Sequence, residues 1–564
     1  MQKRFTLLSF AAIIAVMLFS SCKKSNKQGR YIPANAGVVL MLDGESLNAK
    51  LPWDEVKQNE MFKKMMADTS MPAFGKLIME NPENSGINIK SDLIMFMVKD
   101  TLGGYAAVMG NLKDAGKFKQ FLASANKEAK ETSKDGYTYF SDYKSSVGYN
   151  KDKFIVTMNT PQLSSMDKMN PMNMPGDTTF TMPEAVKYTR DMNAITAMII
   201  NLKEDGSLGK NERFGDMMKS KGDVHFWLNA EYFNSAAGLG PMGAMVNLNK
   251  IYEGAVFTST ANFENGKITV DGKSYGGKEM TDIYRKFSAQ SFDKSMIKNI
   301  PSQNLAGMFA LSFKPEGLKE FLKLLGMDGL ANMGASQLGF NLDDVIKANK
   351  GDFLFALTDL RDDSLKGKDG NFIFAASIAD KASFNKLIEA GRKVESSMKV
   401  GDSSPAKFAY NTNDKYFVLT NNKTTTASYL AGTSNTSYPF MAKISGGPMG
   451  GFVNFQYIMN ALKPKATADS VDIATYDASI KMWDNMYISG GNFKDGGITQ
   501  HWEINMMDKN TNSLKQLNSY SSVMGSINEK RQAKNMDKWK SEDVMWDAID
   551  TTSTMPRKKP VYTK

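Results

Sequence analysis

The chain is poor in the two residue types that most often build metal and catalytic centres, with one cysteine and two histidines among 564 residues. A single cysteine excludes an intramolecular disulfide and a zinc site made of several thiolates. The two histidines, His225 and His501, are too few for a histidine-based metal site, which needs about three converging ligands. No GxSxG motif accompanies either one, so no Ser-His-Asp triad is predicted. We interpret both as ordinary residues of non-equivalent strands.

Other signals are also missing. After the N-terminal segment, no apolar run approaches the roughly 20 residues that cross a bilayer. The 70 basic and 60 acidic residues give a net charge of +10 and are spread along the chain. They form no basic, aromatic-rich stripe of the kind that a nucleic-acid partner requires. Glycine-rich stretches such as SGGPMGG from Ser445 and GLGPMGAM from Gly238 match neither nucleotide-binding pattern. We therefore expect no nucleic acid and no cofactor.

The start of the chain has the pattern of an export signal. Two basic residues precede the apolar run LLSFAAIIAVMLF (7–19), and two serines follow it. Charge, core length and small residues in this order are typical of a secretory signal peptide. The sequence therefore predicts a signal peptide over 1–21, cleaved between Ser21 and Cys22.

This arrangement resembles the lipobox of bacterial lipoproteins. The matching residues are LFSSC, with Phe19 at a position that is usually aliphatic. The resemblance implies that the Cys22 thiol takes a diacylglycerol and that, after cleavage, the new amine is acylated, for example with palmitate. Several acyl chains anchor a protein stably, because each buried methylene contributes about 0.8 kcal/mol. We interpret residues 22–30, with the run KKSNKQGR, as a lipidated basic tether beside anionic headgroups.

Long stretches of the mature chain repeat. GYAAVMGNLKDAGKFKQFL (104–122) aligns without a gap with GNFIFAASIADKASFNKLI (370–388). Each predicts a strand, an aspartate that caps a helix, Asp114 or Asp380, and an amphipathic helix. The apolar residues after the two caps have the same spacing, and we expect both stripes to be buried: Phe118, Phe121 and Leu122 against Phe384, Leu387 and Ile388.

Five further pairs of segments match in the same order, and they begin near Tyr31 and Asn299, Ser91 and Gly351, Asp152 and Asp414, Val224 and Gly451, and Phe263 and Phe493. We interpret them as two related domains, 31–290 and 298–512, followed by a helical segment and loose tail over 513–564. Period-two alternation of apolar and polar residues favours antiparallel strands with helices on the sheet. The predicted fold class is therefore α+β, in two related halves.

The mature chain is similar to a family of uncharacterised Bacteroidetes lipoproteins that carry a domain of unknown function. The resemblance rests on the lipobox, on YIPANAGVVLMLDGESL (31–47) and on NERFGDMMKSKGDVHFWLNAEYF (211–233). It implies an envelope location and no known activity. Surface-exposed members usually carry acidic residues just after the cysteine, whereas this chain carries basic ones. We therefore expect an outer-membrane lipoprotein that faces the periplasm.

One methionine-rich segment, MDKMNPMNMPGDTTFTM (166–182), suggests a soft-metal site, because thioethers bind Cu(I). The candidate ligands are Met166, Met169, Met172 and Met174. However, the chain has 40 methionines, so local clusters are expected, and the segment falls where the first half is longer than the second. We interpret it as an inserted loop.

Three functions follow as hypotheses. The first is a non-enzymatic, membrane-anchored binding or scaffold module with an envelope protein or glycan as partner. The second is an envelope hydrolase that cleaves a glycan with two carboxylates, which would need two facing acids roughly 5–9 Å apart in a cleft. The third is a copper binder that uses the methionine loop.

Overall fold

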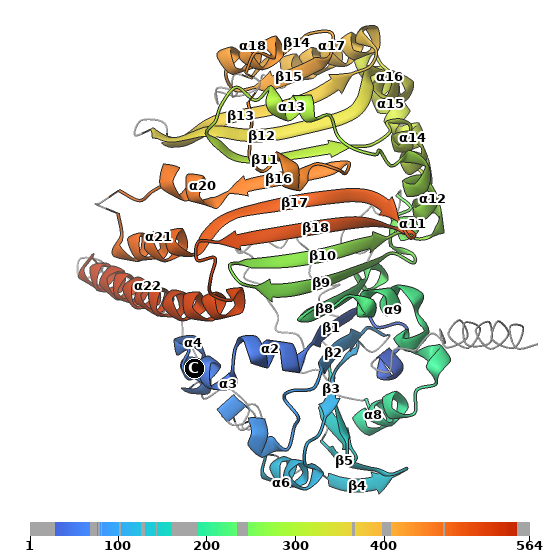
Figure 1. Cartoon of the computed structure of the whole chain (residues 1–564), viewed down its shortest axis with the longest axis vertical. Coiled ribbons are helices and arrows are strands. Elements are labelled where there is room, and N and C mark those ends of the chain that lie inside the picture. The colour runs from blue at the N-terminus through green and yellow to red at the C-terminus, as the bar shows by residue number, and fades with distance from the viewer. Residues whose placement is uncertain are drawn as a thin grey trace, which may run out of the picture.

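The protein is described here from a computed structural model. The structure describes residues 29–549 except for the stretches 68–75, 77–78, 81, 101–102, 126–129, 143, 161–189, 234–245, 364–366, 398–407, 435 and 466–467. Within this part, eighteen strands form one antiparallel sheet flanked by helices (Figure 1). The predicted α+β class is confirmed. None of the helices in the described part combines the length and the hydropathy needed to cross a membrane.

The strands fall into two groups that meet at β10 and β18. The first group is β1 (Val38–Leu42), β2 (Leu93–Val98), β3 (Tyr105–Asn111), β4 (Lys130–Lys134), β5 (Tyr137–Ser141), β6 (Ser145–Tyr149), β7 (Lys153–Asn159), β8 (Val224–Asn229), β9 (Val256–Glu264) and β10 (Lys267–Tyr275). The second is β11 (Leu305–Ser312), β12 (Asn349–Asp363), β13 (Gly367–Ile378), β14 (Ala409–Thr412), β15 (Tyr416–Thr420), β16 (Met449–Asn454), β17 (Trp483–Lys494) and β18 (Gly497–Met506).

The order of the strands is the same on both sides of the β10–β18 pair. Moving away from β10, the neighbours are β9, β8, β1, β2, β3, β7 and β6. Moving away from β18, they are β17, β16, β11, β12, β13, β15 and β14. The strands that the aligned segments contain stand in matching places: β1, β2, β3, β7, β8 and β10 in one series, and β11, β12, β13, β15, β16 and β18 in the other. The duplication of a domain itself stays a prediction.

The register of the strands follows the same correspondence. Leu40 lies opposite Met95 in the first half, and Phe309 lies opposite Phe355 in the second. The sequence alignment is out by one residue between β7 and β15, however. Lys153 lies opposite Asn111 of β3, and Tyr416 lies opposite Ser377 of β13. Because the alignment pairs Asn111 with Ser377, Lys153 and Tyr416 are equivalent in the sheet.

The helices and short 3-10 turns surround this sheet. The helices are α2 (Gly44–Lys50), α3 (Trp53–Lys57), α4 (Glu60–Ala67), α6 (Ala115–Ala125), α8 (Met192–Ile200), α9 (Glu212–Lys219), α11 (Asn249–Tyr252), α12 (Lys278–Phe287), α13 (Lys294–Lys298), α14 (Glu316–Leu324), α15 (Asp328–Leu338), α16 (Leu342–Ala348), α17 (Lys381–Ser397), α18 (Lys423–Ala431), α19 (Met441–Ile444), α20 (Phe455–Ala461), α21 (Ser470–Met482) and α22 (Ser513–Ile549). The 3-10 turns are η1 (Gly29–Tyr31), η2 (Pro82–Ser85), η3 (Glu204–Gly206), η4 (Leu208–Lys210) and η5 (Ala230–Phe233).

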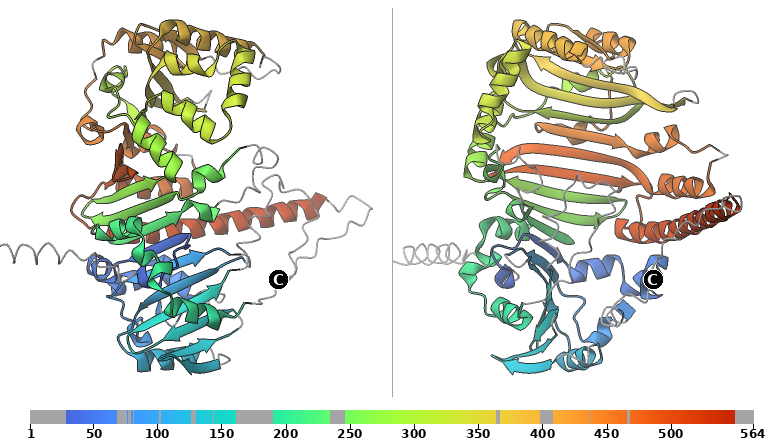
Figure 2. Two further views of the ribbon diagram at one scale, coloured as in Figure 1. Left: turned by 90° about the vertical axis from the view of Figure 1, so that its right-hand side faces the viewer. Right: turned by 180° about the vertical axis from the view of Figure 1, so that it is seen from behind.

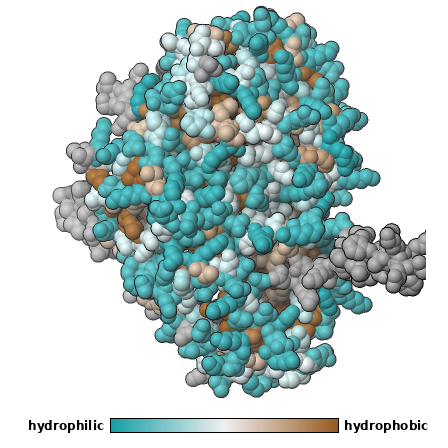
Figure 3. Space-filling model, in the orientation of Figure 1, coloured by the Kyte–Doolittle hydropathy of each residue, from teal (hydrophilic) through white to brown (hydrophobic). Residues whose placement is uncertain are grey.

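One face of the sheet, the helix-covered face, carries the main core of each half. Helices α8 and α9 pack on β6–β9, and α18 and α19 pack on β14–β17. The first core includes Phe96, Phe214 and Trp227, and the second includes Leu354 and Tyr429, all at most 2% exposed. Seen from this side, the surface is mainly hydrophilic with small apolar patches (Figure 3).

The opposite face, the open face, is rich in aromatic side chains. Phe309, Phe355 and Phe374 lie side by side across β11, β12 and β13, and the rings of Phe355 and Phe374 are 4.9 Å apart. Phe355 is 46% exposed and Trp502 is 38% exposed. Viewed from behind, strands β11, β12, β16, β17 and β18 show no coloured helix lying across them (Figure 2).

Helices α6 and α17 pack on the two ends of the open face. Asp114 accepts a hydrogen bond from the Lys117 N–H at 3.0 Å, and Asp380 accepts one from the Ser383 N–H at 2.7 Å. Both predicted helix caps are therefore confirmed.

The two predicted apolar stripes differ in burial. In α6 all three members are buried, with Phe118 at 0% exposure. In α17 Phe384 is buried, but Leu387 and Ile388 are only half-buried. The expectation of equal burial is wrong for these two, because the α17 cluster has few partners, among them Ile378.

Helix α22 contains the predicted C-terminal helical segment, and it packs against α4 and α21. Asn59 donates to the Asn518 carbonyl oxygen at 2.7 Å, and the rings of Trp483 and Tyr520 meet edge to face. The first and last thirds of the chain are thus joined beside the ends of the central strands (Figure 1). The predicted loose tail beyond residue 549 lies outside the described residues.

The difference between the stripes predicts different effects of truncation. We expect Phe118→Ala to cost about 3–5 kcal/mol of unfolding free energy, because it leaves a closed cavity. Leu387→Ala should cost less than about 2 kcal/mol, because water reaches the gap. Urea denaturation of both variants measures the two values. Equal losses would contradict the burial that the structure shows.

Candidate functional site

Several residues singled out from the sequence lie outside the described part of the chain. These are the cleavage and lipidation residues Ser21 and Cys22, and the methionines Met166, Met169, Met172 and Met174. The anchor and the copper hypothesis therefore stay predictions.

The two histidines lie on the helix-covered face but are not brought together. His225 is on β8 and His501 is on β18, with β9 and β10 between them. Three strand spacings separate the two backbones by about 14 Å. The His225 ring is buried, with Nε2 2.9 Å from the Ser220 carbonyl oxygen. Among the described residues, no cluster of three or more His, Cys, Asp or Glu side chains is arranged to hold a metal.

His501 instead forms a pair with an aspartate on the adjacent strand. Its Nδ1 lies 2.8 Å from Oδ1 of Asp271. This hydrogen bond, followed by the charge of Asp271, raises the pKa of His501 above its ordinary value of 6.5, and partial burial opposes the effect. The pair is exposed on the central strands, where it links β10 to β18.

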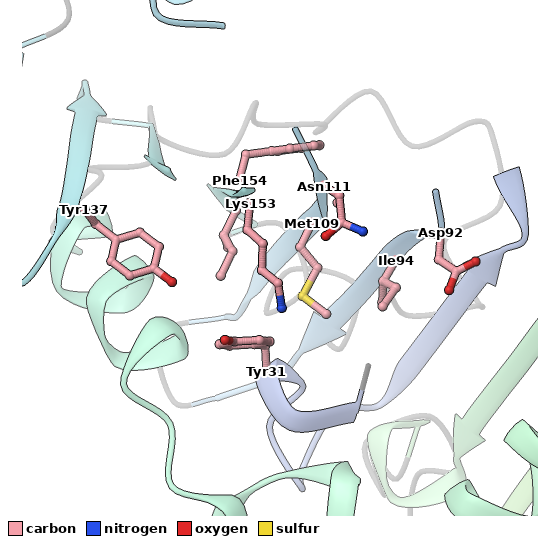
Figure 4. A pocket seen from close by; sticks show the side chains of 10 residues that line it. Tyr31, Asp92, Ile94, Met109, Asn111, Tyr137, Lys153 and Phe154 are labelled. Atoms are coloured by element: carbon pink, nitrogen blue, oxygen red, sulfur yellow. The ribbon is translucent and has the colours of Figure 1, made fainter. Parts of the chain in front are cut away.

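A small pocket lies on the helix-covered face of the first half, between η1 and strands β2, β3 and β7 (Figure 4). Its volume is about 240 Å³. The floor is apolar, because Ile94, Met109 and Ile155 each extend from one of three adjacent strands and are nearly fully buried. Tyr31 and Tyr137 contribute aromatic rings to the wall, and burial raises the pKa of the Tyr137 phenol.

The pocket contains two side chains of opposite charge. The Lys153 ammonium lies 4.6 Å from the centre of the Tyr31 ring, a cation–π contact. Asp92 lies on the far side of Met109 and Ile94 from this lysine (Figure 4). Among the described residues, neither charged group forms an ion pair within 4.0 Å.

Asp92 is the more unusual of the two charges. Burial raises the pKa of its carboxyl group, the neighbouring Asp43 raises it further, and His225 lowers it. The described residues offer its carboxylate no hydrogen-bond donor. A partly buried carboxylate without a donor is costly, because the water it loses is not replaced by protein groups.

A second, polar pocket of about 510 Å³ adjoins the first and shares Asp92. Its central acid, Asp223, is 1% exposed but fully partnered. The Lys50 ammonium lies 2.6 Å from both carboxylate oxygens, Ser46 donates at 2.5 Å, and the Phe263 N–H donates at 2.6 Å. Asp223 therefore ties α2 to β9, and this part of the structure needs no ligand.

The equivalent position in the second half is closed. Asp352, which aligns with Asp92, accepts hydrogen bonds from the Asp293 N–H at 3.2 Å and from the Ser377 hydroxyl at 3.2 Å. Tyr416, the equivalent of Lys153, donates its hydroxyl to Asp293 at 2.6 Å. The second half thus provides hydrogen-bond partners for groups that have none among the described residues of the first half.

Sequence reasoning did not find Asp92 and Lys153. The signal that could have found them is the comparison of the two halves, where a lysine replaces a tyrosine beside a shared aspartate. This substitution is hidden by the one-residue shift in the alignment of β7 with β15.

Comparison with known proteins places the pocket in a recognised domain. A family model, the domain of unknown function DUF4836, matches residues 29–170, and all residues that line the pocket fall in this range. The match covers less than half of the chain. No curated protein matches the sequence.

Two solved structures of TP0453 are similar to part of the chain. Crystal form IV has 10% sequence identity and a TM-score of 0.26, and it covers 47% of this chain and 87% of that one. Crystal form III has 11% identity and a TM-score of 0.25, with 47% and 88% coverage. At these TM-scores the likeness supports no statement about fold or function.

The His501–Asp271 pair makes a pH-dependent prediction. The pKa of His501 is raised in the folded state, so the pair stabilises the fold fully at pH values below the ordinary histidine pKa. This contribution is lost as the pH rises through the pKa of His501 in the folded protein. In Asp271→Asn we expect the His501 pKa to fall toward 6.5, as measured by NMR titration of the ring protons. An unchanged pKa would show that Asp271 is not its partner in solution.

Proposed function

We propose that the protein is a lipid-anchored, non-enzymatic binding module of the cell envelope, with its ligand site in the first half and a scaffold role for the second. The observation that supports this proposal is the contrast between two equivalent positions. Asp92 and Lys153 face a pocket, and their charged groups have no ion pair and no hydrogen bond among the described residues, whereas Asp352 and Tyr416 are hydrogen-bonded within the protein.

The contrast has a physical meaning. The second half shows that this scaffold can satisfy the aspartate with a serine hydroxyl and a backbone N–H. The first half has Asn111 where the second has Ser377, and its aspartate stays without a donor from the described residues. A polar arrangement that lowers the stability of the fold, although the scaffold allows a better one, is typical of a functional site. A ligand that supplies the missing partners would recover this free energy on binding.

The site is built on a rigid support. Its floor residues come from β2, β3 and β7, three adjacent strands in the sheet that continues into the second half. Side chains on paired strands are held more accurately than side chains on loops, which favours selective binding.

The proposed anchor would keep this site close to the membrane. Tyr31, a wall residue, follows Cys22 by nine residues. Nine residues in a fully extended chain reach about 30 Å at most. We therefore propose that the pocket faces the periplasm within this distance of the outer membrane.

A second candidate, the glycan hydrolase, is favoured by one observation. The pKa of Asp92 is raised, and Asp43 is a neighbouring acid; glycosidases use two carboxyl groups in different environments. Binding is the better supported function because Lys153 also opens into the pocket, where a glycosidase mechanism has no need of a second, opposite charge.

The anchor is tested by substitution of the lipobox cysteine. In Cys22→Ala we expect no incorporation of labelled palmitate and an accumulation of uncleaved precursor, because the thiol that would take the lipid is absent. Metabolic labelling followed by immunoprecipitation measures both. A variant that is still acylated would refute the anchor.

The binding function is tested by blocking the pocket. Asn111 is exposed at the pocket rim, so Asn111→Trp should obstruct the opening without disturbing the floor. We expect protein isolated from envelopes to release a small molecule, detected by mass spectrometry, that is absent from this variant. Lys151→Trp, at an exposed position outside the pocket lining, is the matched control. Absence of any bound small molecule, and of any compound that raises the melting temperature, would refute the function.

A further inference from the structure

We propose that the pocket binds a dipeptide with an apolar side chain, with its terminal ammonium beside Asp92 and its terminal carboxylate beside Lys153. This inference rests on the proposed binding function and names the ligand class for the same site.

The charges of the pocket define the two ends of the ligand. Asp92 and Lys153 are separated by the side chains of Met109 and Ile94 (Figure 4). Neither forms an ion pair with another described residue, so each has room for an opposite charge. A ligand with one charge would satisfy one group and leave the other unpaired, whereas a zwitterion satisfies both and adds no net charge to the pocket.

The aromatic wall of the pocket positions the positively charged Lys153 side chain. The face of the Tyr31 ring holds the Lys153 ammonium at 4.6 Å, so the lysine is directed into the pocket rather than into solvent. The cation–π contact is an electrostatic attraction to the ring face. The ammonium has three N–H donors, so it can still donate a hydrogen bond to a ligand. A carboxylate of the ligand can therefore bind this lysine without displacing it.

The floor between the charges determines the body of the ligand. Ile94, Met109 and Ile155 present a buried apolar surface, and a methionine adapts its shape to different side chains. The amide of Asn111, at the rim, can donate to a carbonyl or carboxylate oxygen. These features suit a dipeptide, whose backbone separates the two charged termini and whose apolar side chain can lie on the floor.

The size of the pocket limits the ligand further. Pockets for drug-sized molecules have volumes of about 300–1,000 Å³, whereas this one has about 240 Å³. A dipeptide fits this volume, and an extended oligopeptide or an oligosaccharide does not.

The second half provides the internal comparison. There the hydroxyl of Tyr416 occupies the position equivalent to the Lys153 side chain, and Asp352 receives its hydrogen bonds from Ser377 and from the Asp293 backbone. In the second half, two hydrogen-bond donors of the protein therefore stand beside the aspartate, where the first half would hold the ligand. An ammonium group of a ligand would act on Asp92 in the same way.

The test uses calorimetric titration of the protein with leucylglycine, N-acetyl-leucylglycine and leucylglycine amide at low salt. We expect the free dipeptide to bind about ten- to hundredfold more tightly than either blocked form, because each blocked form leaves one charged group unpaired. In Asp92→Asn the N-acetyl form and the free dipeptide should bind equally. In Lys153→Met the amide and the free dipeptide should bind equally.

Controls separate this inference from the proposed function. Lys415→Met, an exposed substitution in the second half, should leave all three affinities unchanged, and circular dichroism checks that the pocket variants are folded. Binding of the dipeptide that is indifferent to both Asp92→Asn and Lys153→Met would overturn the assignment of the site. Binding of a neutral or singly charged envelope compound in preference to all three probes would overturn the ligand class and leave the binding function intact. Failure of every compound to bind would refute both.

Discussion

The pairing of β10 with β18 is the interaction on which the rest of the structure depends. Nine residue pairs, from Lys267 opposite Asn505 to Tyr275 opposite Gly497, join the strands along their full length. Each strand is also paired on its other side, with β9 and β17 respectively, so neither leaves an unpaired edge in the middle of the sheet. The two strand groups therefore form one sheet, and the helices that cover the main core of each group, α8 and α9 in one and α18 and α19 in the other, lie on the same face of it.

This continuity gives the two faces different roles. On the helix-covered face, the cores around Phe96 and Leu354 stabilise each half separately. On the open face, the row of Phe309, Phe355 and Phe374 extends across the second half with partial exposure. The candidate pocket lies on the helix-covered face beside the first core, so its floor is part of a well-packed region while its rim stays accessible.

Comparison of the two halves separates structural from functional residues. The paired threonines Thr157 and Thr196 in the first half have their counterpart in Thr420 and Thr426 in the second, with hydroxyl oxygens 2.7 Å and 2.8 Å apart. Such shared contacts serve the fold. Lys153 differs from its counterpart Tyr416, because the Tyr416 hydroxyl donates to Asp293 whereas the Lys153 ammonium has no ion pair among the described residues. The proposed ligand site therefore differs locally from the matching position in the second half.

The sequence by itself determined the α+β class, the matching order of segments and the two helix caps, because alternation, helical spacing and capping are local properties of the chain. Asp114 and Asp380 were predictable for this reason. Only the tertiary structure decided that β10 and β18 join the halves, that Leu387 is half-buried, and that Asp92 and Lys153 share a pocket. These features depend on strand register and on contacts between residues distant in the chain. A shift of one residue in β7 would turn the Lys153 side chain to the opposite face of the sheet, away from the pocket.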